Sequence, residues 1–600
     1  MRDPLYCQTC PASHPLRFLP SGAAIPLLSR VLTLLAVVLL VGLLPWLSDQ
    51  DPALALLRAR AAEQEATPEA LAAIRQSLGL DRGPLGLLAG WLRGLLHGDA
   101  GVSWISGRPV MPGMLQALRV SLTLMSFAAL LALAVALLVA LPTFMRGLRG
   151  TPQRPGGAIA AALTALPEFL LATVLLVVGA VWLGLFAPYG WHGPRDAVLP
   201  ALAMGLPAGG YLGRLFADAL AATFSEPWVL TWRAAGIVRR HLLIAAVKRA
   251  LATVMPLTGL VLVSLAGSAV AVEKVFAIPG LGRATLGAVM AQDLPTLQLG
   301  ILLLLLLAGA AGTLAGALRL AILGRALRSR ALPARAAPHR PRSVRAGWLP
   351  LGCLLLLALL LACGLPRDPY ASDFMRLAPP SLSLPFGADA LGRDLLARVA
   401  HGTLYTCLLA LAVSLCCLLL GMLLGAFPRL MQGPTEAANA LPPVIAGLLV
   451  VALMGPGTLS AAVAVAAVAW APLASHTAAL VTEIHARPWM SALPVVGVDG
   501  LRRQLRYVVP ALAGPLFRHA MLRLPGIALA LAAVGFLGLG TPPPEPEWGR
   551  ILAEGMPYLE RGFWCVLAPA GALVLLSVLA VSLAHLAAPA RPKADRAPGA

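Results

Sequence analysis

The chain has 600 residues, of which 59% are hydrophobic and 12% are charged, and its mean hydropathy is +0.82. A soluble protein carries about 25% charged residues, so this composition excludes a soluble globular protein and predicts a polytopic membrane protein in contact with lipid. The net charge is +20, but most arginines lie in short segments between apolar runs, as in the cytoplasmic loops of membrane proteins. No basic face belongs to a soluble domain, so nucleic acid is not an expected partner.

The first half of the chain contains six apolar runs, each close to the 20 or so residues that span a bilayer. The runs are 25–47, 115–141, 158–186, 198–221, 254–275 and 297–318. Residues 1–24 precede them as an arginine-containing tail that we expect on the cytoplasmic side. A polar, nearly neutral insert at 48–115 is expected outside, with a helix at 68–80 where apolar residues recur at helical spacing.

A basic segment at 319–347 separates the two halves. It contains eight arginines, three prolines and no acidic residue, which is typical of a flexible cytoplasmic linker. The half that follows, 348–590, has apolar runs at 349–365, 404–427, 444–459, 461–481, 511–537 and 563–586 before a tail at 591–600. Twelve spans place both termini in the cytoplasm. The halves then share one orientation and are related by a pseudo-twofold axis along the membrane normal.

Two polar interruptions share a motif in which Pro-Trp and seven further residues are followed by Gly. The copies run from Pro227 to Gly236 and from Pro488 to Gly497, 261 residues apart. Proline fits the first turn of a helix and glycine fits its end, so each copy predicts a short helix outside the membrane. Pro494 lies inside the second copy, where it should shorten or kink the helix.

The sequence lacks the motifs of the common hydrolases and of nucleotide binding. Its three lysines, Lys248, Lys274 and Lys593, occur in no Walker A loop, and there is no HExxH or GxSxG motif. We therefore expect no catalytic residue, no bound cofactor and no metal in this chain. Cys7 and Cys10 form a single CxxC, which we interpret as part of a disordered tail rather than a metal site.

Two glutamates lie in or beside apolar runs, where acidic side chains can mark ion or proton pathways. Glu273 adjoins Lys274 at the end of a run, so we interpret it as a solvated loop edge. Glu168 follows Pro167, and the residues leave open whether it faces a pathway or only begins a helical segment.

A Gly-Arg pair and a Gly-Leu-Gly stretch recur in the same order in both halves, at 107–108 and 280–282 in the first and at 392–393 and 538–540 in the second. Each half also carries motifs of its own. They are GLDR at 79–82, GDAGVS at 98–103, SGRPV at 106–110, VEKVF at 272–276 and PGLGR at 279–283 in the first half, and FGADALGRD at 386–394, FLGLG at 536–540, Pro544, Pro546, WG at 548–549 and LAEG at 552–555 in the second. Together they resemble the membrane subunits of ATP-binding-cassette importers of the dipeptide, oligopeptide and nickel class. Residues 20–330 resemble the B-type subunit and residues 347–590 the C-type subunit.

The resemblance implies an all-α protein of two parallel six-helix repeats, of the type I importer kind, in a bacterial inner membrane. It would import peptides or a similar small solute, such as a nickel chelate, by alternating access. Two separate ATPase subunits or domains would supply the energy from the cytoplasm, and an extracytoplasmic solute-binding protein would deliver the solute.

By the same resemblance, the Pro-Trp loops are the EAA loops that contact the ATPases. The residues implied are Trp228, Thr231, Arg233, Ala234 and Gly236 in the first loop and Trp489, Ser491, Ala492 and Gly497 in the second. Leu230 and Ser491 stand where the family has glutamate.

Two other classes stay open. A secondary transporter of two six-span repeats would need ionisable residues near the membrane centre, and few are evident in the sequence. A membrane scaffold without transport activity would need neither an ATPase nor a binding protein.

Overall fold

The structure is a computed structural model that describes residues 24–47, 53–54, 56–57, 67–78, 83–151, 163–164, 167–323, 347–439, 441–498 and 500–586. Within these residues the regular elements are helices, accompanied by two isolated β-bridges. The CxxC at Cys7 and Cys10, most of the linker and the C-terminal tail lie outside the described residues.

The first half runs from the N-terminal helix to the start of the linker. Its helices are α1 (Ala24–Gly42), α2 (Leu44–Leu47), α4 (Pro68–Ser77), α5 (Gly83–Leu96), α6 (Val110–Arg149), α8 (Glu168–Leu175) with the π-helix η2 (Leu176–Trp182), η3 (Pro194–Ala197), α9 (Val198–Phe224), α10 (Pro227–Ala234), α11 (Arg239–Val275), α12 (Leu281–Met290) and α13 (Leu294–Leu323).

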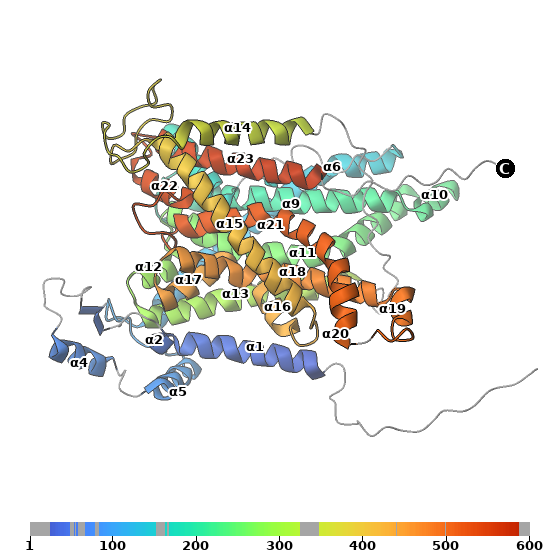
Figure 1. Ribbon diagram of the computed structural model, residues 1–600, viewed down its shortest axis with the longest axis horizontal. Helices are drawn as coiled ribbons and strands as arrows, with labels where there is room; N and C mark the ends of the chain where they lie inside the picture. The colour runs from blue at the N-terminus through green and yellow to red at the C-terminus, as the bar shows by residue number, and fades with distance from the viewer. Residues whose placement is uncertain are drawn as a thin grey trace, which may run out of the picture.

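The second half repeats this plan. Its helices are α14 (Trp348–Gly364), α15 (Leu395–Gly425), α16 (Gln432–Asn439), α17 (Pro443–Met454), α18 (Thr458–His485), α19 (Pro488–Ala492), α20 (Gly500–Arg503) with the π-helix η6 (Gln504–Val508), α21 (Val509–Phe536), α22 (Trp548–Gly555), η7 (Met556–Tyr558) and α23 (Trp564–Leu586). In Figure 1 the long helices run side by side, with α12 and α22 at one end and α10 and α19 at the other.

Each of the twelve predicted spans coincides with a helix, which confirms the all-α fold of two repeats. Six of the described helices are long and apolar enough to cross a membrane, or seven if the bent pair α16 and α17 forms one span, and four shorter apolar helices stand at other predicted spans. The helix predicted at 68–80 is α4, while α5 was not predicted. α6 ends at Arg149 and α11 begins at Arg239, so both continue beyond their apolar runs.

Small residues let two membrane helices of the first half pack closely. Gly205, Gly209 and Gly213 recur every four residues on α9 and face α6. A Cβ atom at Gly209 would lie 2.7 Å from the carbonyl oxygen of Ala132. Such close backbone approach is a main source of helix association in lipid, where apolar burial gives little net gain.

The first helix joins the opposite half. α1 packs against α16, where Arg30 Nε lies 2.7 Å from Glu436 Oε2. The hydroxyl of Ser29 donates to the carbonyl oxygen of Leu430 at 2.6 Å. These contacts join residues about 400 positions apart, so the two repeats form one interlocked body rather than two separate bundles.

We expect Gly209→Leu to destabilise the protein by about 1–3 kcal/mol or more, because the added side chain would force α6 and α9 apart. Gly309→Leu is the matched control, since a Cβ atom at Gly309 on α13 meets nothing within 4 Å. Thermal stability in detergent, followed by size-exclusion chromatography after heating, measures both. Equal midpoints for the two variants would contradict this account of the packing.

Candidate functional site

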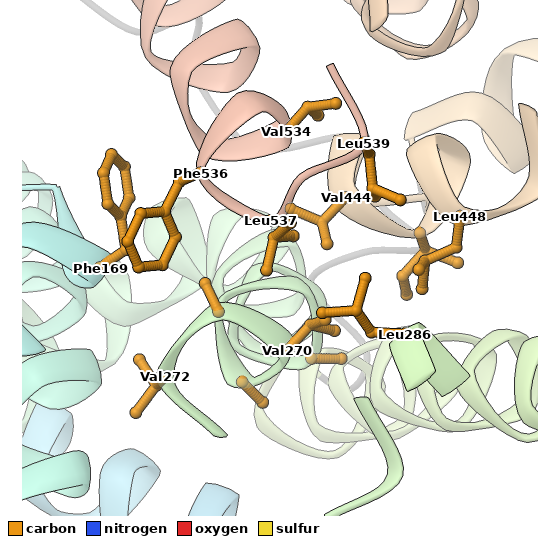
Figure 2. Packing of buried hydrophobic residues seen from close by; sticks show 14 of the residues in the cluster. Phe169, Val270, Val272, Leu286, Val444, Leu448, Val534, Phe536, Leu537 and Leu539 are labelled. Atoms are coloured by element: carbon orange, nitrogen blue, oxygen red, sulfur yellow. The ribbon is translucent and has the colours of Figure 1, made fainter. Parts of the chain in front are cut away.

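The two halves meet in an apolar cluster at the end of the molecule that carries α12 and α22. Phe169 of α8 stacks on Phe536 of α21 with ring centroids 5.3 Å apart, and both side chains are buried. Lys274 Nζ lies 5.3 Å from the centre of the Phe536 ring and donates to the carbonyl oxygen of Phe536 at 2.8 Å. Figure 2 shows Leu537 and Leu539 among the neighbouring side chains. Any pathway between the halves is therefore closed at this end.

A buried carboxylate caps α12 in the first half. Glu273 is fully buried; Ser121 Oγ donates to its Oε1 at 2.5 Å and the backbone N–H of Arg283 to its Oε2 at 3.0 Å. The same Ser121 oxygen accepts the N–H of Leu281 at 2.8 Å. The interpretation of Glu273 as a solvated loop edge was therefore wrong: the side chain points inward and holds the start of α12.

A second buried carboxylate caps α22 in the other half. Glu547 is 3% exposed and accepts the backbone N–H groups of Gly549 at 2.8 Å and Arg550 at 2.9 Å. Burial raises the pKa of Glu547 to about 7, although these hydrogen bonds and the nearby Arg550 charge act in the opposite direction. Gly535 gives this carboxylate room, since a Cβ atom there would lie 2.0 Å from Glu547 Oε2.

An ion cluster fastens the FGADALGRD stretch to α22. Asp389 Oδ2 accepts from Arg393 Nε and Arg398 Nη1, each at 2.7 Å. Glu554 accepts from Arg393, Arg398 and Arg550 at 3.0 Å each. Burial would raise the pKa of Asp389, but the backbone N–H of Arg393 and the two guanidinium groups outweigh it and hold the pKa below its usual range. Sequence resemblance singled out these stretches without indicating that they bind each other.

Glu168 is the first residue of α8, next to Phe169 of the stacked pair, and it is half-buried. It therefore lies beside the closed end of the interface as well as beginning a helix, and both interpretations of this residue stay open.

The first Pro-Trp motif forms α10 beyond the opposite end of the bundle. Val229 is fully buried against α9 and α11 and anchors the helix. Trp228 Nε1 donates to Glu226 at 2.7 Å, and Glu226 also accepts from Arg249 Nε at 2.9 Å. Arg233 donates to the carbonyl oxygen of Gly147 at the end of α6. α10 is thus tied to three long helices of its half.

The second motif forms the shorter helix α19, as expected from Pro494. Met490, at the position of Val229, is buried, so both helices dock through the second residue after proline. α19 ends at Ala492, two residues before Pro494. The side chain of Ser491 lies outside the described residues.

Both helices end in the same glycine turn. Gly236 has φ +69° and Gly497 φ +75°, which confirms that glycine supplies a left-handed conformation there. The residue after Gly236 donates its N–H to Trp232 O, and the residue after Gly497 donates to Leu493 O. The hydrogen bonds recur at the same 261-residue offset as the sequence motif.

The predicted contact residues gather on the surface around these turns. Thr231, Ala234, Gly236, Trp489, Ala492 and Gly497 are exposed, while Trp228 and Arg233 are half-buried. Large apolar side chains are exposed beside them: Leu230 at 67%, Val238 at 62%, Val495 at 86% and Val496 at 71%. Exposed apolar groups outside a membrane indicate surfaces that another protein covers.

Comparison with known proteins identifies the family. Residues 132–330 and 395–591 each match the family described as the binding-protein-dependent transport system inner membrane component. The chain belongs to this family. The matches fall one in each half, so the chain is a fusion of two permease units, as the B-type and C-type resemblances predicted.

Curated relatives of the permease are similar to one half at a time. It is 37% identical over 256 residues to the di/tripeptide transport system permease protein DppC of Pseudomonas aeruginosa, covering 39% of this chain and 84% of that protein. It is 31% identical over 293 residues to a Brucella abortus protein named as a putative peptide transport system permease, covering 45% and 89% respectively. The chain is therefore a multi-pass inner-membrane permease of a transporter and not an enzyme.

The raised pKa of Glu547 predicts that stability falls as pH rises from about 4.5 to about 7. In this range the folded protein binds more protons than the unfolded chain, so each increase in pH favours unfolding until the folded-state pKa is passed. The contribution is at most about 3 kcal/mol. Glu547→Gln should flatten this part of the pH profile of the thermal midpoint in detergent.

Glu560→Gln is the control, since Glu560 is exposed in the same segment between α21 and α23. The pH profile of that variant should match the parent protein. If Glu547→Gln and the parent lose stability equally between about pH 5 and about pH 7, Glu547 is not the titrating group.

Proposed function

We propose that the two halves, 25–318 and 348–590, form the shared pathway of an ATP-driven peptide importer, with 319–347 as a cytoplasmic linker. The supporting observation is that both family matches lie in one chain whose halves interlock. Relatives named for peptide transport favour peptides over a nickel chelate.

The closed apolar cluster around Phe536 corresponds to the outer end of the pathway, and α10 and α19 correspond to the cytoplasmic end. The arginine-rich segments lie at the latter end, in keeping with a cytoplasmic location. A solute-binding protein would dock on the outer segments near α12 and α22. Two ATPase subunits would close on ATP below α10 and α19 and tip the halves apart at the outer end.

α10 and α19 are proposed as the coupling helices, each received by one ATPase. Their exposed residues beside the glycine turns are the groups that a cytosolic partner could reach, with Leu230 and Val495 supplying apolar contact. An ion pair flanks the start of each helix, from Glu226 before α10 and from Arg487 before α19. The anchors are nevertheless unequal, because α10 is longer and Arg233 also donates to the carbonyl oxygen of Gly147, and no such carbonyl contact is found for α19 among the described residues. We therefore expect the first loop to tolerate less change at its centre.

The deciding experiment reconstitutes the chain in proteoliposomes with its genomic-neighbour ATPases and solute-binding protein. Uptake of a labelled dipeptide or tripeptide should require ATP and both partners, and the chain alone should hydrolyse no ATP. Uptake driven by an ion gradient without ATPases would instead support a secondary transporter. Failure to bind any ATPase would support a scaffold.

Gly236→Val and Gly497→Val should each lower transport at least several-fold while leaving membrane insertion intact. Valine at positive φ costs more than about 1 kcal/mol, so the glycine turn should reorganise and misplace the short helix. Asparagine tolerates this conformation, so Gly236→Asn and Gly497→Asn are the matched controls and should retain most activity.

Single cysteines at Thr231 and Ala492 give a second measurement, since crosslinking to the ATPases reports contact directly. Normal transport in both valine variants together with no crosslink from either cysteine would refute the coupling role.

A further inference from the structure

Three helices bring an unusual group of polar side chains together inside the membrane region. His476 of α18 stacks on His519 of α21, with ring centroids 4.4 Å apart. Arg523 follows His519 by one helical turn and interacts electrostatically with it. Tyr211 of α9, from the opposite half, lies within electrostatic reach of Arg523. The group therefore draws on both halves of the permease.

The depth of this group is close to the middle of the membrane. Arg523 lies 13 residues before the end of α21 at Phe536, which is about 20 Å along a helix. The hydrocarbon core is about 30 Å thick, so this arginine cannot reach the outer surface by extending its side chain. Charged residues at such depth are costly and normally face a water-filled cavity or a partner.

Arg523 has no such partner among the described residues. Its guanidinium makes no hydrogen bond or ion pair to them, and its electrostatic neighbours are Tyr211, Cys417 and His519. The side chains of Arg523, His476 and His519 are all half-buried rather than enclosed. A half-buried cation with donors to spare and no acceptor is suited to receiving an anion.

Tyr211 lies on the side of α9 that faces away from α6. Gly209 and Gly213 contact α6, and a residue between them lies about half a turn from each. Tyr211 is accordingly 44% exposed. The electrostatic interaction of Tyr211 with Arg523 on α21 links one half to the other.

We infer that Tyr211, His476, His519 and Arg523 form a subsite in the pathway that binds a carboxylate of the passing solute. Arg523 supplies the positive charge, and the histidine rings and the tyrosine hydroxyl supply additional donors. The choice of a peptide carboxylate rests on the proposed function, whereas the anion preference of the site does not.

The test uses the full-length chain with its own cysteines replaced, Tyr211→Cys as reporter, and nanodiscs of phosphatidylcholine only. Two methanethiosulfonate reagents of similar size, one with a sulfonate and one with a trimethylammonium group, label Cys at this position. The rate of each reagent at position 211 is divided by its rate at an exposed loop cysteine. This normalised rate should be about tenfold higher for the sulfonate reagent than for the trimethylammonium reagent. Arg523→Gln should reduce this preference to near one, and Arg523→Lys should retain it.

Arg518→Gln is the matched control, because Arg518 lies on the same helix, is exposed and projects from another face. This variant should keep the preference of the parent. The inference is overturned if Arg523→Gln leaves the preference unchanged, or if neither reagent reaches position 211 from water.

Protection identifies the ligand chemistry without changing Arg523, so it stays decisive if Arg523→Gln fails to fold. Millimolar trialanine should slow labelling by the sulfonate reagent several-fold, while trialanine amide should not. Equal protection by both would refute carboxylate recognition. Loss of labelling on adding phosphatidylglycerol would assign the site to a lipid headgroup instead. Peptide uptake that fails with all partners present would reject the proposed function but leave a measured anion preference standing.

Discussion

One buried carboxylate in each half stabilises the end of this permease that carries α12 and α22. Glu273 and Glu547 both accept hydrogen bonds from backbone N–H groups at the start of a short helix, α12 and α22 respectively. Unsatisfied N–H groups at a helix start are costly when buried, and a carboxylate there satisfies them while complementing the helix dipole. With both short helices fixed, the segment from Phe536 to Leu539 is held against α8 and α11, where it closes the interface between the two halves.

The glycine turn is the same in both halves, but the short helix that precedes it differs. In α10 the residue at position 233 is an arginine with a backbone N–H to donate, whereas the matching residue of the second loop, Pro494, has none. α19 therefore stops at Ala492, yet the carbonyl groups of Leu493 and Pro494 still accept the hydrogen bonds that close the glycine turn. The repeat thus preserves the surface next to each glycine while changing how firmly each helix is anchored.

The sequence was a good guide to features that depend on local chemistry. A helix stands at each of the twelve apolar runs, and the glycines of the Pro-Trp motif adopt the positive φ expected of them. The sequence failed where neighbours along the chain point in different directions. Glu273 and Lys274 looked like one solvated charged pair, but adjacent helical residues diverge by about 100°, and Lys274 reaches Phe536 while Glu273 points to Ser121. α5 was missed because the insert at 48–115 was interpreted from its charged residues, and the apolar segment Gly83–Leu96 inside it was not considered separately.

The polar group around Arg523 could not be predicted from the sequence for a related reason. His476 and His519 are 43 residues apart, and each is a single histidine in an apolar run, so only the packing of α18 on α21 joins them. Scarcity of charge in a membrane chain therefore does not mean that its pathway is apolar. Because a buried cation costs several kcal/mol, a fold tolerates few of them, and those it retains tend to lie where water or solute can meet them. In this permease Tyr211 of one half lies within electrostatic reach of Arg523 of the other, so the polar group joins the two halves.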